Sequence, residues 1–271
     1  MTGPALRTDF VAGVPRLAYD HAGAGEVVVF LHGIGGNASN WHRQLAKLAD
    51  GYHAVAWDAR GYGNSDDYAG ALDFADFARD LARLLDHLGC AQAHLCGLSM
   101  GGRIALDFHD HYPERVRSLA LVDTFPGYDA SFTQEGRERF VRERRQPLLD
   151  GKEPADIAAD VAATLVSPRA TPEVVQQLVD SMCRLHKDSY LKTIEAMTMY
   201  QPVCDVSRIR VPVQIIVGAD DRLTPPKVSR KMAAAIPDAR LLVLEDTGHL
   251  SNLENPDAFD ACLRAFLDNQ A

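Results

Sequence analysis

The sequence has no Cys-x-x-Cys pair, no long apolar run and no apolar N-terminal segment. Its five cysteines are scattered and odd in number, so we interpret them as free thiols rather than as zinc ligands or disulfides. No apolar run reaches the roughly 18 residues that a membrane-spanning helix needs, and residues 1–7 lack the apolar core of a signal peptide. The sequence therefore favours a cytoplasmic protein without membrane contact.

Basic residues are outnumbered by acidic ones. The formal net charge is −9 and the isoelectric point is near 5.5, so the surface repels phosphate backbones and anionic lipids. This excludes nucleic acid as an expected partner. His109 and His111 could suggest a metal pair, but on a helix their side chains would point about 200° apart. We expect neither a metal nor an organic cofactor.

What the sequence does contain is the alternation typical of an α/β domain. Hydrophobic residues make up 46% of the 271 residues, which is enough to bury a sizeable core. Apolar stretches of strand length alternate with segments of helical period, such as 74–88, and predict a mostly parallel sheet flanked by helices. The expected strands are 27–31, 53–57, 93–96, 119–122, 213–217 and 241–244.

This alternation stops between Pro126 and about Asp205. The segment is charge-rich and helical in period, with interruptions expected at Pro147, Pro154, Pro168 and Pro172. We interpret residues 126–205 as a helical cap inserted into a core domain that consists of residues 1–125 and 206–271.

Residues 97–101 read Gly-Leu-Ser-Met-Gly and place a serine between a predicted strand and a predicted helix. A serine on such a sharp turn needs small residues two positions away on either side, and Gly97 and Gly101 meet that need. The turn also aims the first N–H groups of the helix at charge that develops beside the serine. The pattern predicts Ser99 as a nucleophile and the N–H group of Met100 as an oxyanion donor.

A serine nucleophile needs a base, and His249 is the best of the ten histidines. It follows the predicted strand 241–244, at the sheet edge where α/β proteins place their sites. The carboxylate that orients it should follow the preceding strand, where Asp220 and Asp221 are adjacent. Asp123, after the strand 119–122, is a third possibility. The residue pattern does not choose among the three.

A glycine-rich loop, His-Gly-Ile-Gly-Gly at residues 32–36, directly follows the first strong strand. Its spacing matches neither the dinucleotide-binding nor the P-loop pattern, which argues against a nucleotide site. Its glycines instead let backbone N–H groups approach a bound carbonyl closely. The loop predicts the N–H group of Ile34 as the second oxyanion donor.

With these residues in place, the chain resembles the α/β-hydrolase superfamily from His32 through Asp-Ala-Arg-Gly-Tyr-Gly-Asn-Ser at 58–65 to its C-terminal helix. In that superfamily a Gly-x-x-Asp-x-x-x-Pro stretch carries the acid. Gly218, Asp221 and Pro225 match it, so the resemblance selects Asp221. The runs 96–102, 221–226 and 249–256 look most like those of 3-oxoadipate enol-lactonases and related esterases.

This resemblance implies a hydrolase of small carboxylic esters or lactones that works through an acyl-enzyme. Two alternatives remain open. Ring-cleavage C–C hydrolases also carry Ser-Met-Gly-Gly, although their elbow usually has asparagine where this chain has Leu98. Some small-molecule receptors keep this fold and an intact triad without turnover. Hydrolases of the fold that use an aspartate nucleophile are disfavoured by Ser99.

The predicted cap also contains a cluster of arginines in an otherwise acidic chain. Such a cluster could attract a substrate carboxylate and bind it through paired hydrogen bonds, or it could be a solvated helix face that never meets the pocket. The arginines concerned are Arg137, Arg139, Arg142, Arg144 and Arg145, set against Glu138 and Glu143.

Overall fold

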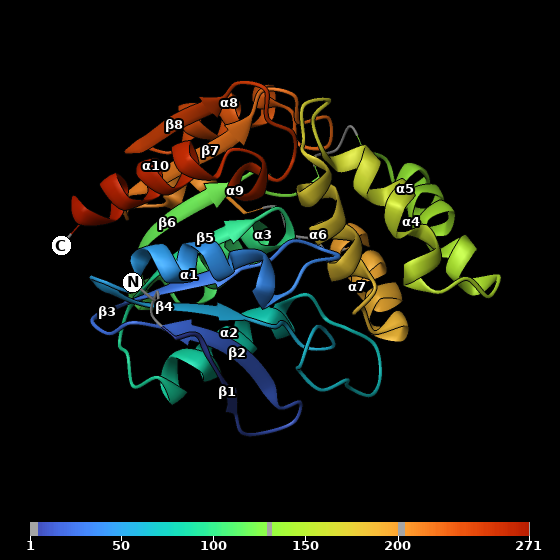
Figure 1. The fold of residues 1–271 in the computed structure, drawn as a ribbon, viewed down its shortest axis with the longest axis horizontal. Coiled ribbons are helices and arrows are strands. Elements are labelled where there is room, and N and C mark those ends of the chain that lie inside the picture. Colours follow the sequence, from blue (N-terminus) through green and yellow to red (C-terminus); the bar gives the residue numbers. More distant parts are fainter. Residues whose placement is uncertain (1–4, 129–131, 200–203, 271) are drawn as a thin grey trace.

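The structure is a computed structural model, and it describes residues 5–128, 132–199 and 204–270. Within these residues, no helix is both long enough and apolar enough to cross a membrane. The described strands form a single sheet in the order β1-β2-β4-β3-β5-β6-β7-β8 (Figure 1). The strands are β1 (Arg7–Val11), β2 (Leu17–Ala22), β3 (Glu26–Leu31), β4 (Tyr52–Trp57), β5 (Ala93–Leu98), β6 (Val116–Val122), β7 (Val213–Gly218) and β8 (Ala239–Leu244).

All six predicted strands are present, and from β4 to β8 the neighbouring strands in the sheet run parallel. The sequence analysis missed the antiparallel pair β1 and β2 at one edge of the sheet. β1 is exposed along most of its length, and its residues Arg-Thr-Asp-Phe-Val form no apolar run. A search for buried strands therefore had no signal there.

Helices cover both faces of the sheet because side chains alternate along each strand. In β3, Val27, Val29 and Leu31 belong to one hydrophobic cluster, whereas Val28 and Phe30 belong to the other. α2 (Ala75–His87), α3 (Met100–His111) and α8 (Pro226–Ala235) contribute to the first cluster, and α1 (His42–Leu48) and α10 (Pro256–Asp268) to the second. The shorter helices are η1 (Ala38–Trp41), η2 (Pro113–Arg115), η3 (Val206–Arg208) and α9 (Ser251–Glu254).

In the described residues, four α-helices precede η3 between β6 and β7: α4 (Gln134–Leu149), α5 (Pro154–Leu165), α6 (Pro172–Met182) and α7 (Lys187–Met199). Figure 1 shows them together at one end of the molecule, away from the helices that flank the sheet. Within this α4–α7 segment, α4 packs on α7 and α5 packs on α6. We propose that the segment is the cap expected at residues 126–205, with residues 1–125 and 206–271 as the core.

One predicted helix interruption is wrong. Pro147 lies inside α4, which continues to Leu149. A proline removes only one backbone hydrogen bond, and close to a helix end that loss is small because the last turn is already incomplete. Pro154 and Pro172 do mark boundaries, since each is the first residue of its helix. Pro168 lies between α5 and α6.

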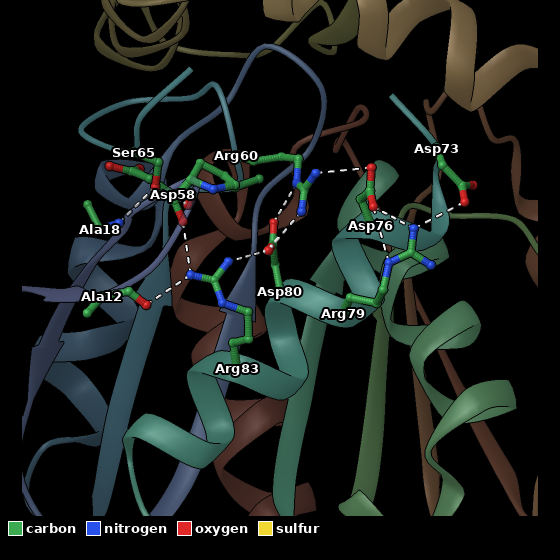
Figure 2. Close-up of polar contacts among 12 residues, drawn as sticks. Ala12, Ala18, Asp58, Arg60, Ser65, Asp73, Asp76, Arg79, Asp80 and Arg83 are labelled. Atoms are coloured by element: carbon green, nitrogen blue, oxygen red, sulfur yellow. Dashed lines mark hydrogen bonds and ion pairs between the residues drawn. The ribbon is translucent and has the colours of Figure 1, made fainter. Parts of the chain in front are cut away.

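A network of ion pairs attaches α2 to the loop that follows β4 (Figure 2). The guanidinium of Arg60 lies 2.6 Å from the Asp80 carboxylate and 3.0 Å from that of Asp76. Asp80, whose side chain is 1% exposed, also pairs with Arg83 at 2.9 Å. Arg83 in turn donates to the carbonyl of Ala12 near the end of β1. The network therefore links α2, the N-terminal strands and the loop after β4.

The same loop braces the glycine-rich loop that follows β3. Asp58 Oδ1 accepts a hydrogen bond from the backbone N–H of Ala38 at 2.7 Å. Ser65 donates to the Asp58 carbonyl and accepts from the N–H of Ala18, as Figure 2 shows. These bonds fix the backbone at Ala38, just after residues 32–36, which the sequence predicts as part of an active site.

Candidate active site

Ser99 lies on a strained turn between β5 and α3. Its backbone has φ 54° and ψ −114°, a conformation that L-residues rarely adopt. A Cβ atom on Gly97 would lie 2.3 Å from the Gly101 carbonyl oxygen, and one on Gly101 would lie 2.0 Å from the Leu31 carbonyl oxygen. Both glycines are therefore required by backbone contacts. The turn leaves Ser99 3% exposed, in the wall of a cavity.

Asp221 and His249 come together from the loops after β7 and β8. Nδ1 of His249 lies 2.8 Å from Oδ2 of Asp221, and both residues are buried. The other carboxylate oxygen, Oδ1, accepts from the N–H groups of Leu223 and Thr224, and the Thr224 hydroxyl donates to Oδ2 at 2.7 Å. The carboxylate is thus held in one orientation facing the imidazole.

The electrostatics of this pair favour its charged form. Burial lowers the pKa of His249, but the hydrogen bond and negative charge of Asp221 outweigh burial and raise it above its ordinary value of 6.5. Burial raises the pKa of Asp221, but the bonds from His249 and Thr224 outweigh burial and lower it. An imidazolium that forms at His249 is therefore stabilised by Asp221.

The other ring nitrogen of His249, Nε2, is buried and has no hydrogen-bond partner among the described residues. His249 and Ser99 line the same cavity. The backbone N–H of His249 donates to the carbonyl of Leu165, the last residue of α5, at 2.8 Å. The hydrogen bond from Nδ1 to Asp221 thus orients the imidazole, and Nε2 has no partner among the described residues.

The other two carboxylates considered in the sequence analysis occupy different positions. Asp123, at the end of β6, accepts from the N–H groups of Gly218 and Ser251 and from the Ser251 hydroxyl. It braces the loops that carry Asp221 and His249 and has no hydrogen bond to His249. Burial raises the pKa of Asp123 to about 7. Asp220 is exposed, and its backbone N–H bonds to Thr247.

The glycine-rich loop approaches Ser99 closely. A Cβ atom on Gly33 would lie 3.3 Å from the Cβ atom of Ser99, and Ile34 lines the cavity beside it. His32 fixes the start of the loop, because its Nδ1 donates to the Gly33 carbonyl and its Nε2 accepts from the N–H of Ala59. Burial lowers the pKa of His32 to about 4, which keeps the ring neutral as this bonding requires. Met100 is the first residue of α3.

Two cavities, each of about 650 Å³, meet at Ser99. The first is lined by residues 32–36, by the end of α5 and by His249. The second has a mainly aromatic and aliphatic wall. That wall includes Phe125, Tyr128, Phe132, Phe140, Ile194, Met197 and Met232.

The wall of the first cavity contains several polar side chains. Besides His249, three residues in this wall carry a buried polar atom without a hydrogen-bond partner in the described part of the chain: Asn40 (Nδ2), Trp41 (Nε1) and Asn252 (Oδ1). Such atoms are costly unless something bonds to them. The second cavity, with its mainly aromatic and aliphatic wall, suits an apolar group.

The predicted arginine cluster separates into residues with different environments. Arg144 lines both cavities. Arg137 is buried and donates to the carbonyl of Tyr128, and Arg145 pairs with Glu195. Arg139 and Arg142 are exposed and line neither cavity. The sequence pattern could not make this distinction, because all five lie on one helix.

Some residues of the site had no signal in the sequence analysis. Thr224, which bonds to Asp221, lies in the run 221–226 but was given no role there, and Tyr190, which lines both cavities, belongs to no pattern considered there. The Thr224 hydroxyl follows Asp221 by three positions and could have been noticed as a local partner. Tyr190 could not, because its place depends on how α7 packs.

Comparison with known proteins agrees with the fold. Residues 26–256 match the family described as alpha/beta hydrolase fold. The chain is 30% identical over 243 residues to 3-oxoadipate enol-lactonase 2 of Acinetobacter baylyi, covering 89% of this chain and 88% of that protein. It is 33% identical over 266 residues to the 2-hydroxy-6-oxononadienedioate/2-hydroxy-6-oxononatrienedioate hydrolase of Burkholderia vietnamiensis, covering 93% and 91%.

Among solved structures, a thermophilic esterase from Thermogutta terrifontis superimposes with a TM-score of 0.87 at 27% identity, covering 97% of this chain and 99% of that one. The resemblance to enol-lactonases and esterases stated from the sequence is thus confirmed. Since the family match spans residues 26–256 and the fold superimposes on that of a solved esterase, this chain belongs to the α/β-hydrolase family.

Proposed function

We propose that this chain is a serine hydrolase that cleaves a small carboxylic ester or lactone. Ser99 is the nucleophile, His249 is the general base, and Asp221 orients His249. The observation that carries the proposal is the 2.8 Å hydrogen bond from His249 Nδ1 to Asp221, which leaves the buried Nε2 atom unpartnered in the cavity that Ser99 lines. That arrangement is what proton transfer from a serine hydroxyl requires.

The reaction proceeds in two steps. Ser99 Oγ attacks the carbonyl carbon while its proton passes to His249 Nε2, and the N–H groups of Ile34 and Met100 stabilise the oxyanion. His249 then gives the proton to the departing alkoxide, which leaves an acyl group on Ser99. In the second step His249 takes a proton from water, the resulting hydroxide attacks the acyl carbon, and the acid is released as Ser99 regains its proton.

The experiment is covalent labelling combined with turnover. An organophosphonate should label Ser99 alone, as judged by mass spectrometry of the labelled peptide, because only an activated hydroxyl beside an oxyanion hole reacts. Ser99→Ala should abolish both labelling and hydrolysis of phenyl esters. Label on a different residue, or normal turnover by Ser99→Ala, would disprove the assignment. Turnover itself would also argue against a receptor without catalysis.

A second candidate is hydrolysis of a C–C bond in a ring-cleavage product. The 33% identity to a hydrolase named for 2-hydroxy-6-oxononadienedioate favours it. Leu98, where such enzymes usually have asparagine, favours the ester or lactone. Comparison of kcat/KM for a 2-hydroxy-6-oxodienoate with that for a small lactone decides between them. A clear preference for the dienoate would replace the ester proposal while keeping Ser99 as the nucleophile.

A further inference from the structure

Arg144 lies where the two cavities meet. The described residues that line both cavities are Ile34, Ser99, Arg144, Tyr190 and Leu223, and Arg144 is the only charged one among them. The serine that we propose as nucleophile and the residue that we propose as oxyanion donor share this junction. A substrate whose carbonyl lies at Ser99 can therefore meet Arg144 from either cavity.

The charge around the cavities is opposite to that of the whole chain. The chain has a formal net charge of −9. Apart from the histidines, the charged residues that line the cavities in the described structure are three cations and one carboxylate: Arg144, Arg222, Lys231 and Asp160. An excess of positive charge in a partly enclosed space attracts and retains an anion.

Arg144 differs from the adjacent Arg145 in having no acidic partner among the described residues. Arg145 is neutralised by Glu195, whereas no carboxylate among the described residues lies within ion-pair distance of Arg144. The guanidinium of Arg144 instead lies 4.2 Å from the centre of the Phe140 ring. Contact with an aromatic ring occupies one face of a guanidinium and leaves its in-plane N–H groups available to bind a carboxylate in a paired arrangement.

We propose that Arg144 binds a carboxylate of the substrate. The preferred substrate is then a small ester or lactone that carries a free carboxylate and an apolar arm, with the arm in the aromatic cavity lined by Phe125, Tyr128 and Phe140. This inference rests on the serine hydrolase function proposed above. It narrows the arginine cluster considered in the sequence analysis to one residue, Arg144, which would select substrates that carry a carboxylate.

The test compares two esters that share a leaving group and differ at the far end of the acyl chain. Phenyl hexanoate is neutral, and the monophenyl ester of adipic acid carries a carboxylate. The wild type should prefer the adipate ester by kcat/KM. Arg144→Gln should reduce that preference by about 10- to 100-fold, mainly through KM, because a charge-assisted bond is lost from the ground state and the transition state alike.

Arg139→Gln is the matched control. It removes the same charge from the same helix at an exposed position outside both cavities. It should leave the preference within about twofold, since an exposed charge at that distance is screened by salt. Circular dichroism and thermal unfolding of both variants would verify that α4 remains folded.

Three outcomes overturn the inference: no preference in the wild type, an unchanged preference in Arg144→Gln, or an equal loss in Arg139→Gln, which would indicate long-range charge alone. In each case hydrolysis of phenyl hexanoate that disappears in Ser99→Ala would still support the serine hydrolase function. Absence of turnover of both esters by the wild type, together with no labelling of Ser99, would instead overturn that function and the inference with it.

Discussion

The carboxylate of Asp221 receives hydrogen bonds from the His249 ring, from the Thr224 hydroxyl and from the backbone N–H groups of Leu223 and Thr224. Each of the two carboxylate oxygens thus accepts two hydrogen bonds. An asparagine side chain would fill the same space, but its NH₂ group would face a donor instead of accepting from it. The position therefore demands a carboxylate rather than a side chain of that shape.

We expect Asp221→Asn to lower kcat by about 10,000-fold, because the amide stabilises the wrong tautomer of His249 and removes the charge opposite the imidazolium. Asp220→Asn is the control, since Asp220 is exposed and next to Asp221 in the chain. It should stay within about twofold of the wild type. Steady-state kinetics with a phenyl ester measures both. A severe loss in Asp220→Asn with an active Asp221→Asn would show that the acid has been misassigned.

The pH profile should report His249. Its pKa is raised above 6.5, and only the neutral imidazole can accept the serine proton, so kcat/KM should fall as pH decreases, with a midpoint above 6.5. The residual activity of Asp221→Asn should have a lower midpoint, because the negative charge that raises the pKa of His249 is gone. A midpoint that does not move between the two proteins would contradict the coupling of Asp221 to His249.

At the scale of single residues, the sequence pattern proposed Ser99 and His249 but left the acid open among three carboxylates. Asp220 and Asp221 are adjacent, and the residue pattern does not state which side chain faces the histidine. Asp123 satisfies the same rule of a carboxylate after a strand. The structure distinguishes Asp123 from Asp221, because the Asp123 carboxylate accepts hydrogen bonds from the N–H groups of Gly218 and Ser251. Only the match to a family pattern selected Asp221 before the structure.

Among the elements, α2 depends on the ion pairs around Asp80. Asp80 is buried, and its carboxylate pairs with the guanidinium groups of both Arg60 and Arg83 (Figure 2). Removing one partner from a buried pair leaves the remaining charge desolvated and uncompensated. The loop after β4, which braces the glycine-rich loop, is attached through Arg60.

We expect Asp80→Asn to lower the free energy of unfolding by about 1.5–3 kcal/mol, measured by urea denaturation, because charge-assisted hydrogen bonds are lost while Arg60 keeps its pair with Asp76. The exposed pair between Arg16 and Asp66, whose side chains are 50% and 49% exposed, provides the control. Asp66→Asn should cost less than about 1 kcal/mol, since exposed pairs contribute little. Equal effects of the two substitutions would show that burial of Asp80 adds no stability.

The sequence predicted helices and strands well where burial produces a run of apolar residues. The six parallel strands are apolar almost throughout because helices cover both of their faces. β1 is exposed and was missed, and α4 contains a proline that was expected to interrupt it. Both errors arise from context: an edge strand needs no apolar run, and a proline near a helix end costs little.

For the molecule as a whole, the α4–α7 segment is joined to the sheet domain by apolar packing, with Met182 and Ile194 in the first cluster and Leu178 in the second, and by polar side-chain contacts. Arg184 donates to Asn37, Ser189 donates to Asp67, and Lys192 donates to the Tyr68 carbonyl. At the other side, the Ser167 hydroxyl donates to the carbonyl of Asp246. Contacts of this kind hold orientation but contribute less to stability than a shared apolar core.

Only Arg137, Val141 and Leu148 of the 16 residues of α4 are buried, whereas every residue of β5 is buried, so we expect α4 to open at a lower free energy than the sheet. Amide hydrogen exchange in low denaturant, followed by mass spectrometry, should show α4 exchanging through openings well below the free energy of global unfolding. Amides of β5 and β6 should exchange only near the global value. If α4 and β5 exchanged together at every denaturant concentration, the proposed division into a core and a cap at residues 126–205 would be wrong.

The sequence predicted the fold and the reaction type more readily than the substrate. Fold and nucleophile depend on local patterns, namely apolar runs and the glycine spacing around Ser99. The substrate depends on which side chains of α4 to α7 reach the cavities. Arg144 does and Arg142 does not, although they are two residues apart on one helix.

β6 and β7 are paired in register from Leu119 with Val213 to Val122 with Ile216, although residues 123–212 separate them in the chain. During synthesis the strands up to β6 emerge first, and the free edge of β6 must then wait until the whole intervening segment has been made. An unpaired strand edge is the feature through which growing chains associate wrongly. The long segment between β6 and β7 therefore prolongs the period in which the nascent protein is vulnerable to aggregation.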